Sequence, residues 1–232
     1  MKNLVKHIGI IACSAEGAAL CYTTICIEAQ EKLFKYRHPE ITMHTPPLAD
    51  YMQFIWNGNW EKVAELMLHS TDIVAKAGAD FAICPDNTIH QAYDLMISKS
   101  PIPWLHIAEV VGEEARRNKF KQLGILGTKY LVSSSVYSNS LKKFRIKCDI
   151  PNDDDREKID KIIFEELVNG TFKESSRQYF NKVIKRLKNK GCDAVVLGCT
   201  EIPLLVNPND CPLPTLDSTR LLARAAIKKA LE

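Results

Sequence analysis

The chain lacks the features that mark several large classes of proteins. Its 232 residues contain no apolar run near the ~20 residues of a membrane-spanning helix. It also contains no GxGxxG or GxxxxGK[ST] loop of the kind that binds nucleotides. The eight cysteines form no CxxC pair and no regular framework, and the histidines show no ligand spacing. We therefore expect no cofactor, no bound metal and no membrane partner.

The bulk composition is that of an ordinary globular protein, with 46% hydrophobic and 25% charged residues and a net charge of +3. The densest basic run, residues 182–190, alternates with apolar residues at helical spacing, which is typical of a solvated helix face. We expect no nucleic-acid partner. The first residues lack the apolar segment of a signal peptide, and the thiols suit a reducing compartment, so the prediction is a cytoplasmic protein.

Short β-branched runs alternate with longer amphipathic stretches, a pattern typical of βαβ units with parallel sheets. The expected fold is α/β, with two similar lobes that each contain a parallel sheet flanked by helices. Two prolines near residue 101 and a proline-rich stretch before residue 215 suggest an N-terminal lobe of residues 1–101 plus 215–232 and a C-terminal lobe of residues 102–214. The expected strands are 8–12, 41–44, 81–84, 104–106, 124–126, 144–148 and 194–197. The expected helices are 16–36, 60–77, 87–98, 108–118, 129–142, 155–169, 174–189 and 218–231.

An internal repeat supports two lobes. Two segments begin with Gly-x-Asp, at residues 78 and 191, and continue through an apolar strand to a polar tip. In this alignment Asp86 and Cys199 each lie six residues beyond the aspartate, an offset of 113 residues. The segments starting at Ile8 and Leu123 repeat at an offset of 115. The sequence therefore predicts a duplicated unit with a different reactive side chain in each copy.

The repeated segments all end where ligands collect in parallel sheets, at the carboxyl ends of the strands. Ser14, residues 86–88, Thr128 and residues 199–200 should then surround one cleft. Small hydroxyl and amide side chains, together with backbone N–H groups at strand-to-helix turns, suit a carboxylate or a phosphate.

The residues 87–90, Asn-Thr-Ile-His, and 198–205, Gly-Cys-Thr-Glu-Ile-Pro-Leu-Leu, resemble the motifs of the aspartate/glutamate racemase superfamily. Members of that family show Cys-Asn-Thr-x-His in the first lobe and the second motif as it stands here. The resemblance implies two lobes related by a pseudo-twofold axis, an active site in the cleft between them, and commonly a homodimer. It also implies cofactor-independent inversion at the Cα of an acidic amino acid by two thiols. The family pattern suggests that Asn87, Thr88, Thr128 and Thr200 contact the substrate carboxylates.

The chain departs from the family pattern where the first catalytic cysteine is expected, because Asp86 stands there. An ordinary aspartate is ionised at neutral pH and an ordinary cysteine is mostly protonated. Asp86 is therefore suited to accept a proton and Cys199 to donate one, so we expect slow or one-handed racemisation. We expect a helix N-terminus to lower the pKa of the Cys199 thiol. Alternatively, Asp86 only caps the following helix.

The leading hypothesis is an isomerase, a pyridoxal-independent racemase of aspartate or glutamate, with Cys199 and Asp86 as catalytic residues. Alternatives are a single-thiol decarboxylase or cis–trans isomerase of a dicarboxylic acid, and a non-catalytic binder of small carboxylates. The expected substrate-binding residues are Ser14, Asn87, Thr88, Thr128, Lys129, Thr200 and Glu201. Lys129 could attract an acidic substrate, and Glu201 could orient a reacting group. Lys173 and Arg177 lie where some family members carry a cationic lid residue.

Overall fold

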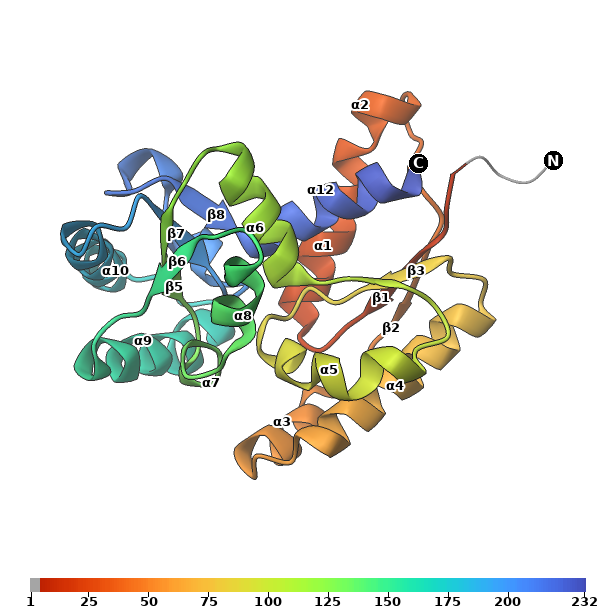
Figure 1. Cartoon of the computed structure of the whole chain (residues 1–232), viewed down its shortest axis with the longest axis horizontal. Coiled ribbons are helices and arrows are strands. Elements are labelled where there is room, and N and C mark those ends of the chain that lie inside the picture. The colour runs from red at the N-terminus through yellow and green to blue at the C-terminus, as the bar shows by residue number, and fades with distance from the viewer. Residues whose placement is uncertain (1–4) are drawn as a thin grey trace. The chain divides into compact units, whose positions relative to one another are not determined.

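The computed structural model describes residues 5–232 and divides into two compact units. The first unit comprises the chain up to Ile107 together with Thr219–Glu232, and the second comprises Ala108–Ser218 (Figure 1). Each unit is an α/β fold with a four-stranded parallel sheet, as the sequence predicted. The division expected at residues 101 and 214 lies a few residues before these limits, and residues 1–4 of the expected N-terminal lobe lie outside the described residues.

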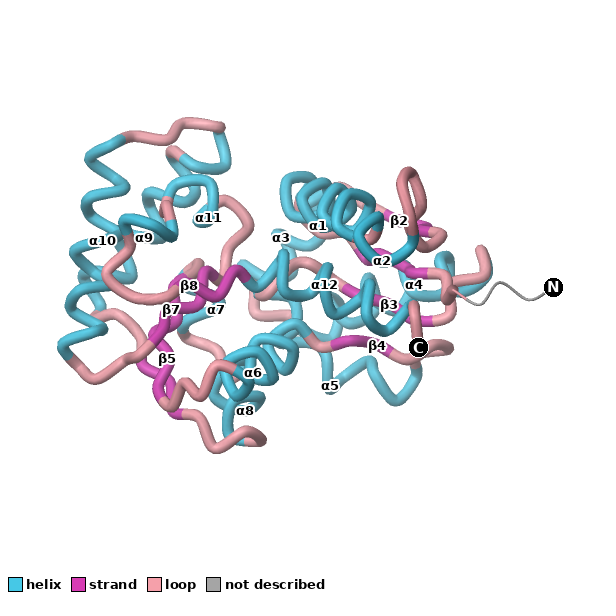
Figure 2. The backbone as a smooth tube through the Cα atoms, turned by 90° about the horizontal axis from the view of Figure 1, so that it is seen from above, coloured by secondary structure: helices cyan, strands magenta, loops and turns pink. Residues whose placement is uncertain are grey.

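The sheet of the first unit has the strand order β2-β1-β3-β4. Its strands are β1 (Ile8–Ile11), β2 (Ile41–His44), β3 (Phe81–Ile83) and β4 (Trp104–Leu105). Helices α1 (Ala15–Glu28) and α12 (Ser218–Ala230) cover one face, and α3 (Leu48–Trp56), α4 (Trp60–Lys76) and α5 (Tyr93–Met96) lie on the other (Figures 1 and 2). The short elements are α2 (Gln30–Leu33), η1 (Thr88–Ala92) and η2 (Ile97–Lys99). Every residue of β1 is buried, because helices cover both faces of a parallel sheet.

The sheet of the second unit has the equivalent order β6-β5-β7-β8. Its strands are β5 (Gln122–Leu126), β6 (Lys147–Asp149), β7 (Ala194–Leu197) and β8 (Thr215–Asp217). Helices α9 (Asp153–Glu165) and α10 (Glu174–Asn189) cover one face, and α6 (Ile107–Arg117) and α8 (Val136–Lys142) cover the other (Figures 1 and 2). The short elements are α7 (Lys129–Val132), α11 (Ile202–Leu205), η3 (Leu167–Asn169) and η4 (Pro208–Asp210).

The Gly-x-Asp repeat has the same structural role in both units. Gly78 and Gly191 adopt φ of 99° and 98°, a left-handed turn between the covering helix and the next strand. The side chains of Asp80 and Asp193 then accept a hydrogen bond, at 2.7 Å in each case, from the backbone N–H that leads into the first strand of their own sheet. The repeat in the sequence is therefore a repeat in the fold.

A second pair of glycines lets a helix approach the central strand of each sheet. A Cβ atom on Gly9 would lie 2.7 Å from Cγ2 of Val74 in α4. A Cβ atom on Gly124 would lie 2.8 Å from Cδ1 of Leu187 in α10. These close approaches place α4 and α10 directly over β1 and β5.

Several predicted helices differ from the structure at their ends or interiors. The helix expected over 16–36 ends at Leu33, because Phe34 and Tyr36 adopt φ of 85° and 65°. The helix expected over 129–142 is interrupted after Val132, where the Ser134 hydroxyl donates to the Leu131 carbonyl at 2.7 Å and competes with the backbone. The helix expected over 87–98 is a succession of short elements, η1, α5 and η2.

Further differences concern one strand, two elements without a prediction, and an acidic cluster. The strand expected over 144–148 begins only at Lys147, because Arg145 adopts φ of 59° in the turn that follows α8. Neither α3 nor β8 was predicted. In the acidic cluster at 152–155, Asn152 caps α9 and accepts from the Asp155 N–H at 2.9 Å. The Asp155 side chain is buried and accepts hydrogen bonds from Arg186 Nε at 2.9 Å and the Tyr179 hydroxyl at 2.7 Å.

Candidate functional site

The first cluster of candidate residues, Ser14 and residues 86–88, lies at the carboxyl ends of the adjacent strands β1 and β3. Ser14 caps α1, and its hydroxyl accepts from the Gly17 N–H at 3.3 Å. Asp86 is partly buried, and its Oδ1 accepts from the Ile89 N–H at 3.2 Å. Asn87 is buried and Thr88 begins η1. Asp86 therefore makes the capping contact considered as an alternative, through one of its two carboxylate oxygens.

His90 makes a hydrogen bond to the main chain of the Asp86 turn. Its Nδ1 donates to the Asp86 carbonyl at 2.7 Å, and its Nε2 accepts from the Ile107 N–H at 3.4 Å. This pair of contacts requires the neutral imidazole with its proton on Nδ1. The buried ring also makes an edge contact with the ring of His106, with centroids 4.7 Å apart. His90 therefore links the Asp86 turn to Ile107, where the first segment of this unit ends.

Two buried thiols lie beside Asp86. Burial, followed by the nearby charge of the Asp86 carboxylate, raises the pKa of Cys13 well above its ordinary value. Burial, again followed by Asp86, also raises the pKa of Cys84, whose Sγ lies 3.9 Å from the Asp86 carbonyl oxygen. Both thiols therefore remain protonated at neutral pH. The place of Cys13 near Asp86 was not predicted, although the internal repeat aligns Cys13 with Thr128.

The second cluster, Thr128, Lys129 and residues 199–201, lies at the carboxyl ends of β5 and β7. The two segments are joined by a hydrogen bond from the Gly198 N–H to the Leu126 carbonyl at 2.8 Å. Thr128 caps α7, with its hydroxyl accepting from the Leu131 N–H at 3.3 Å.

Lys129 is exposed, and its Nζ lies 3.8 Å from Asp160 Oδ2. The Lys129 N–H donates to the other oxygen of this carboxylate at 2.8 Å. The ammonium group can therefore reach solvent while the start of α7 is anchored to α9.

The surroundings of Cys199 differ from the sequence expectation. The nearest helix, α11, has four residues and begins only at Ile202, so Cys199 does not occupy the start of a long helix. Its Sγ instead lies 2.8 Å from Oε2 of Glu201, a side chain that is only 4% exposed. A buried carboxylate that accepts from the thiol favours its protonated form. Cys199 is partly exposed and Thr200 is buried.

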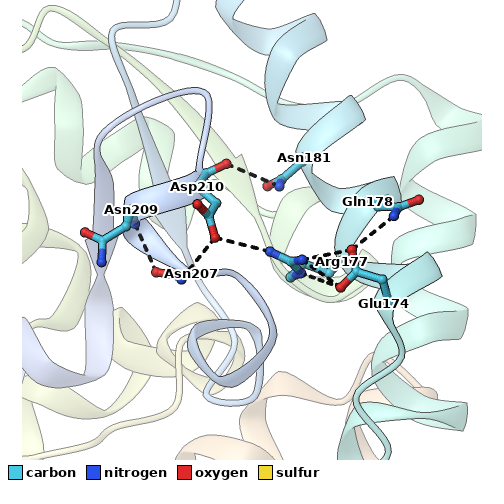
Figure 3. Close-up of polar contacts among 7 residues, drawn as sticks. All are labelled: Glu174, Arg177, Gln178, Asn181, Asn207, Asn209 and Asp210. Carbon is cyan, nitrogen blue, oxygen red and sulfur yellow. Dashed lines mark hydrogen bonds and ion pairs between the residues drawn. The ribbon is translucent and has the colours of Figure 1, made fainter.

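Arg177 has a local structural role in the second unit. Its guanidinium group binds Glu174 on its own helix at 2.7–2.8 Å and reaches Asp210 of η4 at 3.4 Å (Figure 3). Asp210 also accepts from Asn207 at 3.1 Å, and its carbonyl accepts from Asn181 at 3.4 Å. These contacts anchor the loop that follows the Cys199 motif.

Lys173 forms a separate ion pair with Glu166, with Nζ 3.2 Å from Oε1. Its side chain is 55% exposed. The pair lies at the start of α10.

Within residues 5–232, no group of three or more His, Cys, Asp or Glu side chains is arranged to hold a metal ion. None of the helices in the same range combines the length and apolar character that a membrane crossing requires.

Comparison with known proteins places the chain in a family. The model of the Asp/Glu/hydantoin racemase family matches residues 8–226. A Yersinia pestis crystal structure described as a candidate Asp/Glu racemase is 31% identical, with a TM-score of 0.91 over 98% of this chain and 100% of that one. An aspartate racemase homologue from Pyrococcus horikoshii is 28% identical, with a TM-score of 0.86 and the same coverage.

Two curated proteins show a more distant similarity. The broad specificity amino-acid racemase RacX of Bacillus subtilis is 23% identical over 163 residues, which span 67% of each chain. A glutamate racemase from Hydrogenobaculum is 25% identical over 164 residues, and the match spans 68% of this chain but 60% of that enzyme's length. Since the family model covers nearly the whole chain, the protein belongs to the Asp/Glu/hydantoin racemase family.

Proposed function

We propose that the protein is an isomerase that inverts the α-carbon of an acidic amino acid, aspartate or glutamate, without a cofactor. The observation that carries the proposal is the equivalence of Asp86 and Cys199. Asp86 lies three residues beyond Ile83 of β3, which pairs with Ile10 of β1. Cys199 lies three residues beyond Val196 of β7, which pairs with Ile125 of β5. Two proton-transfer groups at equivalent places in a duplicated fold are what inversion at one carbon needs.

The proposed chemistry is two proton transfers on opposite faces of Cα. The Asp86 carboxylate takes the Cα proton and leaves a carbanion, whose charge is delocalised into the substrate carboxylate. The Cys199 thiol then gives its proton to the other face and becomes a thiolate. Asp86 returns its proton to solvent and the thiolate regains one. Because Glu201 favours the protonated thiol, the resting protein is prepared for this direction.

Hydrogen-bond donors must stabilise the carbanion in the absence of another electron sink. Asn87 and Thr88 in the first unit, and Thr128 and Thr200 in the second, are the proposed donors to the substrate carboxylates. Ser14 and Lys129 lie at the same strand ends and complete the set. Recognition of a second carboxylate by these groups is the reason for preferring an acidic substrate.

A carboxylate and a thiol differ in their ordinary pKa, and this difference affects only some of the kinetic constants of racemisation. Racemisation has an equilibrium constant of one, so kcat/KM must be equal in the two directions. Asymmetry can therefore appear only in kcat and KM separately, and in the rate of Cα–H exchange from each enantiomer. We expect kcat to be larger for the enantiomer whose Cα proton faces Asp86.

The test is to incubate each enantiomer of aspartate and glutamate with the protein in D2O. Cα–H exchange is followed by NMR and inversion by optical rotation. Exchange with inversion is expected in the parent chain, and inversion should be lost in Cys199→Ser. Cys211→Ser is the matched control, because Cys211 packs against the same hydrophobic cluster as Cys199 but is remote from the motif in sequence. Absence of exchange from all four substrates would refute the proposal, and binding without exchange would favour a non-catalytic carboxylate binder.

A further inference from the structure

The imidazole of His90 lies between two main-chain groups of the first unit. The residue is 3% exposed and belongs to η1, which follows Asp86 in the chain. Its Nδ1 lies 2.7 Å from the Asp86 carbonyl oxygen, and its Nε2 lies 3.4 Å from the backbone nitrogen of Ile107. Ile107 is the first residue of α6, so its N–H has no acceptor within that helix. His90 therefore joins the turn that carries Asp86 to a helix start 17 residues further along the chain.

Aromatic rings fix the plane of this imidazole. The Tyr93 ring stacks on it with centroids 6.1 Å apart, and the His106 ring meets it edge-on at 4.7 Å. The rings of Tyr93 and His106 are themselves 4.7 Å apart, also edge-on. Such ring contacts favour one orientation over others. The packing thus keeps Nδ1 of His90 directed at the Asp86 carbonyl.

Asp86 is held at two points, and both contacts come from η1. The His90 Nδ1–H donates to its carbonyl, and the Ile89 N–H donates to Oδ1 of its carboxylate at 3.2 Å. When the main chain of a residue and one oxygen of its side chain are both fixed, its carboxylate is held in one place. The placement of the Asp86 carboxylate therefore depends on His90 through the main chain.

The second unit holds the equivalent carbonyl with a different group. Cys199, the counterpart of Asp86, accepts at its carbonyl from the Ile202 N–H at 3.2 Å. The repeat, with its offset of 113 residues, aligns His90 with Pro203, which has no side-chain donor. The carbonyl of the reactive residue is thus hydrogen-bonded in both units, to the backbone in the second and to an imidazole in the first.

We propose that His90 is a positioning residue for Asp86, and that its hydrogen bond to the Asp86 carbonyl sets the carboxylate against one face of the substrate. This inference rests on the proposed function and names a residue that acts through Asp86, without contacting the substrate. Cys199 is held by contacts of its own unit, with Ile202 and Glu201. Loss of the His90 contact should therefore impair proton transfer at one face only, whereas a general loss of structure impairs both.

The experiment compares two amide variants that each keep one of the two contacts. His90→Asn places its amide near the position of Nδ1 and can still donate to the Asp86 carbonyl. His90→Gln reaches the position of Nε2 and can still accept from the Ile107 N–H. Deuterium incorporation at Cα in D2O is measured for each enantiomer separately. The variant Asp86→Asn identifies the enantiomer that Asp86 deprotonates, because that enantiomer loses its exchange.

The two variants should differ at one face of the substrate. In His90→Gln, exchange of the enantiomer that Asp86 deprotonates should fall by about 10- to 100-fold, because a displaced base loses its alignment with the Cα proton. Exchange of the other enantiomer should stay near the rate of the parent chain. In His90→Asn, both enantiomers should exchange at rates near those of the parent chain. Thermal denaturation verifies that each variant is folded.

The tautomer of His90 is measured in the parent chain without substrate, by long-range 1H–15N correlation NMR. This measurement needs no variant. A carbonyl can only accept and a backbone N–H can only donate, so the neutral ring must carry its proton on Nδ1. A neutral ring with its proton on Nε2 would overturn the inference, whatever the exchange rates show.

The outcomes separate this inference from the proposed function. Equal losses for the two enantiomers in His90→Gln, or equal behaviour of His90→Asn and His90→Gln, would overturn the positioning role and leave the proposed function standing. A parent chain without any Cα–H exchange would refute the proposed function, and the role of His90 in that reaction would fall with it.

Discussion

Replacement of Glu201 by glutamine tests the electrostatic setting of Cys199 directly. Glu201 is 4% exposed, and its Oε2 lies 2.8 Å from the sulfur. A hydrogen bond to a charged partner contributes about 1.5–3 kcal/mol. Glutamine keeps the shape and a carbonyl acceptor but removes the charge, so we expect about 1–2 kcal/mol of this preference for the protonated thiol to be lost. The thiolate fraction at a fixed pH then rises roughly 5- to 30-fold.

The assay is alkylation of Cys199 by iodoacetamide, with the eight cysteines resolved by peptide mass spectrometry. A less basic thiolate is also a weaker nucleophile, which offsets about half of the gain on a logarithmic scale. Alkylation should therefore accelerate by about 2- to 6-fold in Glu201→Gln. Glu174→Gln, which removes the same charge from an exposed position of the same unit, should leave the rate unchanged. A rate in Glu201→Gln that is equal to or below that of the parent chain would refute the reasoning.

Three other predictions concern stability and direction. Asp155→Ala breaks the buried ion pair with Arg186 and should lower the free energy of unfolding by about 2–4 kcal/mol, measured by urea denaturation. The control Asp154→Ala, at an exposed position, should change it by less than about 0.5 kcal/mol. Equal effects of the two substitutions would contradict the role of Asp155. Burial and then Asp149 raise the pKa of Cys192 to about 11, so its stabilising contribution is present below about pH 8.5 and is lost as the pH rises through about 11. The urea midpoint should therefore fall over this range, and less steeply in Cys192→Ala; parallel curves would count against it. Asp86→Cys should bring the kcat values for the two enantiomers closer together, measured by circular dichroism, and an unchanged ratio would mean that Asp86 only caps η1.

The duplicated fold could be predicted because its signals are local. A glycine in a left-handed turn and an aspartate that binds the neighbouring strand leave the same Gly-x-Asp signature in both copies. The apolar strands after them are short and continuous, so their positions follow from the same alignment. Asp86 and Cys199 were found in this way, from spacing alone.

Other features depend on contacts between distant residues and leave no local pattern. β8 has three residues and is defined by its pairing with β7. The burial of Asp155 depends on Arg186, 31 residues further along the chain. The contact of Cys199 with Glu201 depends on how the turn before α11 closes, and the motif alone suggested a helix start instead.

Two differences between the predicted and observed helices have separate physical origins. The unpredicted helix α3 starts directly after Pro47 and buries Tyr51 and Ile55, one turn apart. The serines after Val132 compete for backbone groups and divide a helix that the hydrophobic pattern alone would continue. Hydrophobic periodicity records burial, but it does not record such local hydrogen bonds.

The most direct measurement is Cα–H exchange in D2O of each enantiomer separately, in Asp86→Asn and in Cys199→Ser. If each residue serves one face of the substrate, each variant should still exchange one enantiomer without inverting it, and the two variants should retain opposite enantiomers. Inversion that persists in either variant, or retention of the same enantiomer by both, would contradict the assignment of Asp86 and Cys199 to opposite faces.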